Sequence, residues 1–241
     1  MTALLSLKNV SKRFRGLVAV DGVSFDVTEG EIFAVIGPNG AGKTTLFNMV
    51  AGALNSDSGE IIFSGRSITG LPPDAVCRRG IARTFQIVRP FPALSVEDNV
   101  IVGALLKQRD VAAAREQARA VLRRLDLFDK RSRIASTLTL PDRKRLEVAR
   151  ALATEPKLLL LDEVMAGLRP TETDRMVAIL RDINRESGLT ILLIEHVMRA
   201  VMALASRVLV LDHGVAIASG SPEQVVRDPA VVRSYLGTEA V

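Results

Sequence analysis

Apolar and polar positions alternate with a period of two along two early segments of the chain, residues 5–10 and 22–27, and a third segment, residues 59–63, has β-branched and aromatic residues between glycines. These patterns, with turn residues around each segment, predict short strands that are buried on one face. Between the second and third segments lies an unbroken apolar run, residues 32–36, followed by Gly37 and then by apolar residues at helical spacing. Residues 31–51 are therefore predicted to form a strand, a glycine turn and a helix, and the other elements are expected to be arranged around them.

From about residue 95 onward, the apolar residues no longer recur with the period of two that is typical of strands but with the longer period of a helix. Residues 95–108 and 111–127 carry apolar side chains at helical spacing with charges on the opposite face, and no strand pattern intervenes before Leu158. Strand patterns resume at residues 158–163 and 190–194, with a helix predicted from Pro170 to about Ser187. A hairpin around an Asp-His-Gly turn, residues 207–212 and 215–218, and two short helices that each begin at a proline are predicted to complete the chain.

These elements predict an α/β fold with a mostly parallel sheet, an N-terminal antiparallel β-subdomain and an inserted α-helical subdomain. The apolar run LLLLDE is typical of a strand buried on both faces of a parallel sheet. We expect one domain over residues 1–241. Within it, residues 1–88 and 157–241 are expected to form the core with the antiparallel strands, and residues 89–156 the helical subdomain.

Composition narrows the class of protein without deciding its function. The chain has 241 residues, of which 48% are hydrophobic and 24% charged, as in a soluble globular protein. No apolar run approaches the length of a membrane span and the first residues lack the order of a signal peptide, so we expect a cytosolic chain. Cys77 is the single cysteine, which excludes an internal disulfide and fits a reducing compartment.

The formal charge of +5 is compatible with nucleic acid, an anionic membrane face or a bound nucleotide as partner. Proteins that bind single-stranded nucleic acid interleave aromatic side chains with the charges, and here aromatic residues make up only 4% of the chain. We therefore favour dispersed, solvated charges and expect no nucleic-acid partner.

Gly37, Gly42, Lys43 and Thr44 fill the pattern G-x-x-x-x-G-K-[ST] of a P-loop, between a predicted strand and a predicted helix. Glycines let consecutive backbone N–H groups turn onto phosphate oxygens, and the helix directs its positive dipole end at them. Lys43 would neutralise phosphate charge, and the Thr44 hydroxyl would hold Mg²⁺. The expected ligand is therefore ATP with Mg²⁺, and the further contacts of the loop are Asn39, Gly40, Ala41 and Thr45.

Polar residues follow three predicted strands. Asp162 ends its buried strand, where it would be the second Mg²⁺ ligand, and Glu163 could orient or deprotonate the attacking water. His196 follows the strand TILLIE; a structural histidine is the commoner case, yet the strand end could bring it to the γ-phosphate. Gln86 follows the short strand IAR and is uninformative by itself. His213, in the hairpin turn, is assigned no role.

These motifs, in this order and around a helical insertion, resemble the ATP-binding cassette family over nearly the whole chain. The resemblance implies that GPNGAGKTT is the Walker A motif, LLLLDE the Walker B motif with Glu163 as catalytic glutamate, Gln86 the Q-loop glutamine and His196 the switch histidine. It also implies Thr44, Gln86 and Asp162 around the metal. Phe14 matches the aromatic that stacks on adenine, although a core residue at a strand end would look the same.

Within that family, the stretches FRGLVAVDGVSF, RTFQIVRPFPALSVEDNV and DPAVVRSYLG resemble the LivG-like subunits of branched-chain amino acid uptake systems. The expected function is ATP hydrolysis coupled to uptake of a small solute, branched-chain or other amino acids. The implied partners are permease subunits, a second cassette subunit and, indirectly, an extracytoplasmic solute-binding protein. The expected location is peripheral, at the cytoplasmic face of a bacterial inner membrane.

The family's signature motif, LSGGQ, has diverged here to Leu138-Thr139-Leu140-Pro141-Asp142. The resemblance implies that Thr139 and Leu140 stand at positions that contact the nucleotide of a second subunit. Thr139 and Asp142 match a capping box, so the helix start is expected to be intact. Pro141 lacks an N–H, and Asp142 is expected to place negative charge where a phosphate should bind. The sequence therefore predicts a heterodimer with a second, intact cassette, with a homodimer still open.

Two alternative functions remain open at this stage. One is a soluble cassette ATPase that works on nucleic acid or in assembly, which the basic composition suggests. The other is a nucleotide-binding regulatory subunit with weak hydrolysis, which the divergent signature suggests and which the intact Glu163 and His196 argue against.

Overall fold

The computed structural model describes residues 3–86 and 88–236. The first of its two sheets is antiparallel and covers one side of the P-loop. Four strands lie in the order β2-β1-β4-β5. They are β1 (Ala3–Phe14), β2 (Leu17–Thr28), β4 (Ser58–Phe63) and β5 (Arg66–Ser67). The predicted strands are confirmed, but β1 and β2 extend further than the alternating segments, because they pair along most of their length in a long twisted hairpin.

The second sheet carries the P-loop and has the order β10-β9-β3-β8-β7-β6. Its strands are β3 (Ile32–Ile36), β6 (Ile81–Arg83), β7 (Leu158–Asp162), β8 (Thr190–Ile194), β9 (Arg207–Asp212) and β10 (Val215–Gly220). All neighbours are parallel except the hairpin of β9 and β10. Successive residues of β7 pack alternately into the two apolar cores on either side of the sheet, which is why its sequence is uniformly apolar.

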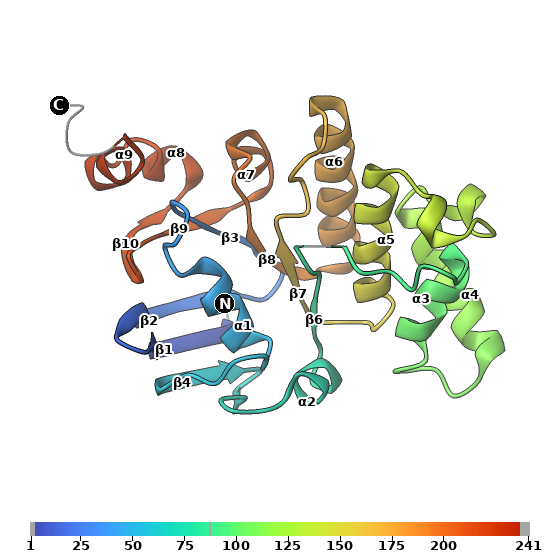
Figure 1. Ribbon diagram of the computed structural model, residues 1–241, viewed down its shortest axis with the longest axis horizontal. Coiled ribbons are helices and arrows are strands. Elements are labelled where there is room, and N and C mark those ends of the chain that lie inside the picture. Colours follow the sequence, from blue (N-terminus) through green and yellow to red (C-terminus); the bar gives the residue numbers. More distant parts are fainter. Residues whose placement is uncertain (1–2, 87, 237–241) are drawn as a thin grey trace.

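Helices cover both faces of this sheet (Figure 1). They are α1 (Lys43–Val50), α2 (Pro73–Arg78), α6 (Pro170–Ser187), α7 (Met198–Leu204), α8 (Pro222–Val225) and α9 (Pro229–Leu236). The predicted helices at α1, α6, α8 and α9 are confirmed. The sequence did not indicate α2 and α7, which are short.

A group of helices between β6 and β7 lies to one side of the sheets (Figure 1). It contains α3 (Val96–Ala104), α4 (Val111–Arg124), two short 3₁₀ turns, Phe128–Lys130 and Ala135–Thr137, and α5 (Leu140–Leu152). Ser95 and Asp110 accept backbone N–H bonds at the starts of α3 and α4, so each helix begins where its cap stands. Across the described residues, no helix is long and apolar enough to cross a membrane.

The predicted fold class, with a mostly parallel sheet, an antiparallel β-subdomain and an inserted helical part, is confirmed.

Candidate functional site

The loop between β3 and α1 has a backbone that only glycine can adopt at two points. Gly37 has φ 147° and Gly42 has φ 99°, both in the region that L side chains avoid. A Cβ on Gly37 would overlap the carbonyl oxygen of Leu211, and one on Gly42 would overlap that of Ala19. The two glycines thus bring the loop close to its neighbours and leave α1 with its N-terminal N–H groups exposed to a ligand.

Lys43, the first residue of α1, lies inside this loop with only 5% of its surface exposed. Its ammonium group donates to the carbonyl oxygens of Gly37 and Pro38, each at 2.8 Å. Burial lowers the pKa of Lys43, while the carboxylates of Glu163 and Asp162 oppose that shift. The loop therefore holds the positive charge of Lys43 beside its own backbone amide groups, an arrangement that suits binding of a phosphate group.

A cavity of about 420 Å³ opens above the loop and gathers most of the predicted site residues. Phe14 stands at its rim, with 43% of its surface exposed. The cavity is lined by Phe14, Leu17, Val18, Ala19, Asn39, Gly40, Ala41, Gly42, Lys43, Thr44, Thr45, Gln86, Glu163, His196 and His213. Residues from both sheets thus meet at one cavity, although they are far apart in the sequence.

Glu163 lies between two of the predicted partners. Gln86 Nε2 donates to Glu163 Oε2 at 2.8 Å, and His196 Nε2 lies 2.9 Å from Glu163 Oε1. Glu163 also has φ 50°, which is uncommon for a residue with a side chain. The backbone N–H of Glu163 donates to Ile194 on β8 at 2.9 Å, so the turn is held by the neighbouring strand.

Lys144 on α5 is a site residue that sequence reasoning missed. Its ammonium group is buried and donates to the carbonyl oxygens of Glu163, at 2.9 Å, and of Gln86, at 3.4 Å. Desolvation lowers the pKa of Lys144, and the nearby carboxylates, Glu195 first, oppose this. The helix that follows the signature is therefore tied directly to the two turns that carry Gln86 and Glu163.

Glu195, which precedes His196, was also missed. It is 1% exposed, and its Oε1 accepts the N–H of Met165 at 2.9 Å. Burial, helped by the charge of Glu163, raises the pKa of Glu195 to about 7. Within the described part of the chain, its Oε2 has no hydrogen-bond partner, which fits a carboxyl that holds a proton near neutral pH.

Asp162 ends β7 and is 1% exposed. Its Oδ2 accepts from Arg83 at 2.7 Å, while its buried Oδ1 has no partner among the residues that the structure describes. A hard cation such as Mg²⁺ prefers carboxylate and hydroxyl oxygens and keeps several ligands from phosphate and water. The unpaired Oδ1 and the Thr44 hydroxyl beside the loop therefore fit Mg²⁺. Residues 3–86 and 88–236 contain no cluster of three His, Cys, Asp or Glu side chains that would hold a metal without such added ligands.

Thr139 and Leu140 lie at the start of α5. They do not line the P-loop cavity; each lines a separate pocket. Thr139 is the N-cap residue, so the predicted helix start is confirmed, but the predicted capping box is wrong. The Thr139 hydroxyl does not cap the helix backbone; it donates to the carboxylate of Asp142, with 3.0 Å between the oxygens.

The expectation that Asp142 presents its charge to a phosphate is also wrong. Asp142 is 1% exposed and is paired with Arg145 at 2.5 Å and with Lys130 at 2.6 Å. Burial opposes ionisation, but the hydrogen bonds from Lys130 and Thr139 and the charge of Arg145 hold the pKa of Asp142 below its usual value. The carboxylate therefore points inward and is neutralised by its two basic partners.

A phosphate-binding loop, an acidic pair at a strand end and a glutamine and a histidine around the second acid together define a nucleotide-hydrolysing P-loop protein. Residues 20–166 match the family model described as "ABC transporter", and the chain belongs to this family of ATP-binding cassettes. Within that family the chain is an ATP-binding subunit, and it is an ATPase. Residues 217–241 match a second model, "Branched-chain amino acid ATP-binding cassette transporter".

Several characterised proteins are similar over nearly their full length. The chain is 39% identical over 249 residues to the "High-affinity branched-chain amino acid transport ATP-binding protein LivG" of Salmonella typhimurium, covering 97% of this chain and 98% of that protein. It is 38% identical over 240 residues to the "Lipopolysaccharide export system ATP-binding protein LptB" of Escherichia coli strain K12, covering 98% of each. The crystal structure of the ADP conformation of MJ1267, an ATP-binding cassette of an ABC transporter, superposes with a TM-score of 0.89 at 31% identity, covering 98% of this chain and 100% of MJ1267.

Proposed function

We propose that this chain hydrolyses ATP to drive uptake of branched-chain amino acids through a membrane permease, at the cytoplasmic face of the inner membrane. The observation that carries the hydrolytic part is the Glu163 carboxylate, held by Gln86 and His196 at the mouth of the P-loop cavity. The amino-acid part is supported by the match of residues 217–241 to the branched-chain amino acid model and by the LivG relatives.

ATP binding would use groups that already face the cavity. Phe14 offers an exposed ring on which adenine can stack, and the loop amides of residues 39–45 surround the phosphates. Lys43 would exchange its bonds to the Gly37 and Pro38 carbonyl oxygens for bonds to phosphate oxygens. Thr44, Asp162 and Gln86 would hold Mg²⁺, which when bound neutralises the charge that develops on the phosphates.

Hydrolysis would depend on the position of Glu163. Gln86 donates to one of its carboxylate oxygens and the ring of His196 lies against the other, and each oxygen keeps a further lone pair for a water molecule. The carboxylate would take a proton from the water that attacks the γ-phosphate, while His196 and Gln86 keep it in place. This is catalysis by positioning and charge stabilisation, the usual mode of phosphoryl transfer.

A second cassette subunit would complete each nucleotide site with its own signature residues. Thr139 and Leu140 of this chain would face the nucleotide of that partner, but Pro141 offers no N–H to a phosphate. A partner with an intact signature would serve the Walker motifs of this chain well, whereas the opposite site would be slow. The divergent signature therefore supports a heterodimer.

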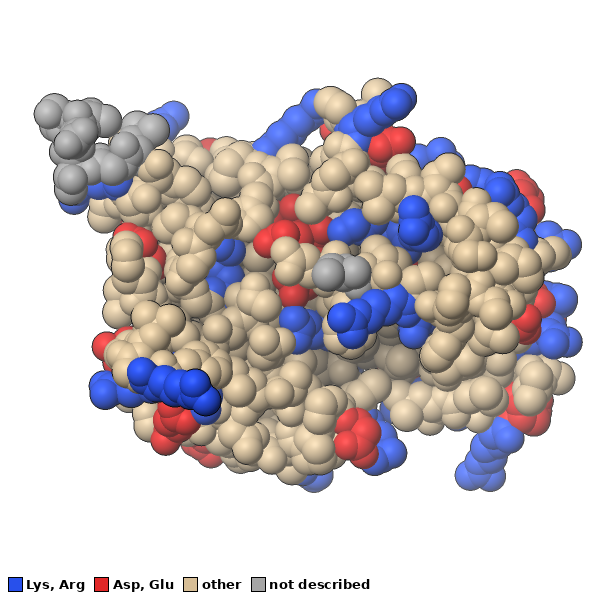
Figure 2. Space-filling view, in the orientation of Figure 1, with Lys and Arg blue, Asp and Glu red and all other residues tan. Residues whose placement is uncertain are grey.

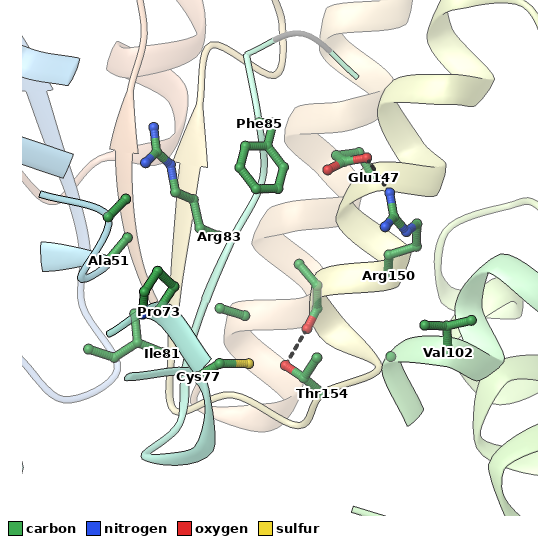
Figure 3. A pocket seen from close by; sticks show the side chains of 14 residues that line it. Ala51, Pro73, Cys77, Ile81, Arg83, Phe85, Val102, Glu147, Arg150 and Thr154 are labelled. Atoms are coloured by element: carbon green, nitrogen blue, oxygen red, sulfur yellow. Dashed lines mark hydrogen bonds and ion pairs between the residues drawn. The ribbon is translucent and has the colours of Figure 1, made fainter. Parts of the chain in front are cut away.

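A permease is expected to dock beside the turn that carries Gln86. A groove of about 320 Å³ lies there, between α2 and β6 on one side and α3 and α5 on the other, and is lined mainly by apolar side chains (Figure 3). Figure 2 shows Lys and Arg side chains gathered over α5 and the segment that follows β6, where Arg89 and Arg143 are exposed. Lys144 would transmit movements of α5 to Glu163, because it bonds to the backbone of that residue.

The decisive experiment is uptake by the assembled transporter. The chain would be purified in mild detergent with its permease and solute-binding protein, reconstituted in liposomes and supplied with ATP and labelled leucine. We expect ATP-dependent leucine uptake that is lost with Lys43→Ala. ATPase activity that responds to lipopolysaccharide and not to leucine would overturn the proposal in favour of export, the process for which LptB is named.

A further inference from the structure

Arg83, at the end of β6, bridges three elements of the nucleotide site. Its guanidinium donates to Asp162 Oδ2 on β7 at 2.7 Å and to Asn48 Oδ1 on α1 at 2.5 Å. The side chains of Arg83 and Asp162 are 12% and 1% exposed. The planar fork of arginine therefore connects the last strand residue of the Walker B motif to the helix that begins at the P-loop.

A buried ion pair is a poor source of stability, because desolvation of both charges offsets their attraction. The acidic side chain of the neighbouring groove does not form an ion pair with Arg83. The groove acid Glu147 is paired with Arg150 at 3.1 Å, and Figure 3 shows the Arg83 side chain pointing away from both of them. The charge of Arg83 is thus committed to Asp162.

The ion pair between Arg83 and Asp162 uses only one of the two oxygens of the Asp162 carboxylate. Arg83 occupies Oδ2, whereas Oδ1 is buried and has no partner among the described residues. The N–H of Asp162 donates to the Thr84 hydroxyl at 3.1 Å, so the backbone below the carboxylate is held as well. With Oδ2 held by Arg83, Oδ1 is the oxygen left for a cation or for a water molecule bound to it.

We propose that Arg83 is a positioning residue that orients Asp162 so that Oδ1 serves Mg²⁺ when Mg·ATP binds. The inference rests on the metal role proposed above for Asp162. Loss of Arg83 would leave the P-loop and its phosphate contacts intact but would let the Asp162 carboxylate turn. The expected defect is therefore in the contribution of Mg²⁺ to ATP affinity, and not in the affinity for ATP itself.

The test measures the dissociation constant of a nonhydrolysable ATP analogue by calorimetry, once with Mg²⁺ and once with EDTA. For the full chain with Arg83→Met, we expect the gain in affinity from Mg²⁺ to shrink about tenfold, the value of one charge-assisted hydrogen bond, with the EDTA value unchanged. Arg83→Lys keeps the charge but cannot bridge Asn48 and Asp162 with one planar fork, so we expect it to restore only part of the gain. Arg79→Met is the matched control, since this exposed arginine donates to the Ser67 carbonyl oxygen, away from the site.

Asp162→Asn separates the inference from its premise. If Asp162→Asn leaves the Mg²⁺ gain intact, the metal role proposed for Asp162 fails. If Asp162→Asn removes the gain and Arg83→Met does not reduce it, or weakens binding equally with Mg²⁺ and with EDTA, the positioning role of Arg83 is overturned. Should Arg83→Met not fold, the same comparison with Arg83→Lys decides, because an unchanged Mg²⁺ gain there also contradicts the proposal.

Discussion

Replacing Asp142 with asparagine should destabilise the start of α5, although the sequence pattern suggested that loss of this charge would be beneficial. The carboxylate accepts bonds from Arg145 at 2.5 Å, Lys130 at 2.6 Å and Thr139 at 3.0 Å, and the residue is 1% exposed. Removal of one partner of a buried ion pair costs about 3–5 kcal/mol. Because 36% of the Lys130 side chain is exposed and can be hydrated, we expect the lower end, about 3 kcal/mol.

Urea denaturation of Asp142→Asn and of the unchanged chain measures this cost as a difference in the free energy of unfolding. The pKa of Asp142 is lowered in the folded chain, so its stabilising contribution is present above the ordinary aspartate value of 3.8 and is lost as pH falls through the folded pKa. The difference between the two proteins should therefore be full at pH about 7 and should shrink in acid.

Asp126→Asn is the matched control, because this carboxylate also contacts Arg145, at 3.8 Å, but is 45% exposed. We expect it to cost less than about 1 kcal/mol. An Asp142→Asn cost as small as that of the control, or a cost that does not change with pH, would refute the inward, paired state of Asp142.

Three further predictions address the site. Lys43→Ala should weaken ATP binding about ten- to a hundredfold, since one charge-assisted contact is lost, and calorimetry that finds an unchanged affinity with Mg²⁺ would rule out the P-loop role. Pro141→Gly restores an N–H without disturbing Asp142 and should raise the ATP hydrolysis rate of this chain alone by up to about tenfold; an unchanged rate would show that the missing donor is unimportant. Glu195 has a pKa of about 7 in the folded chain, so its neutral form stabilises the fold at low pH and this contribution is lost as pH rises through 7. Glu195→Gln should therefore gain stability relative to the unchanged chain between pH about 5 and 8, by at most about 1.4 kcal/mol per pH unit in urea denaturation, and a constant difference would contradict the neutral carboxyl.

Local spacing made the P-loop readable from the sequence. Gly37, Gly42, Lys43 and Thr44 are neighbours in the chain, and the strand before them and the helix after them follow from the apolar pattern. Family resemblance added Gln86 and His196, whose contacts with Glu163 the structure then revealed. Each of these residues follows a strand, and the parallel strands β6, β7 and β8 bring their ends to one edge of the sheet.

Contacts between distant segments were not readable in the same way. Arg83 and Asp162 are 79 positions apart, and Lys144 reaches a carbonyl 19 positions away, so no periodicity indicates either pair. Asp142 matched a local capping pattern, but Lys130 and Arg145 supplied stronger, charged partners and drew its carboxylate inward. The short helix α7, with the sequence MRAVMAL, offers too few turns for a helical period to be distinguished.

The central claim is that Glu163, held by Gln86 and His196, is the group that activates water for ATP hydrolysis. Glu163→Gln keeps the shape of the side chain and its capacity for hydrogen bonds but removes the base. Phosphate release by the complex with its partner cassette and permease, measured beside ATP binding by the same preparation, tests this claim most directly. We predict that Glu163→Gln binds ATP as tightly as the unchanged protein and releases almost no phosphate, whereas phosphate release at a near-normal rate would contradict the claim.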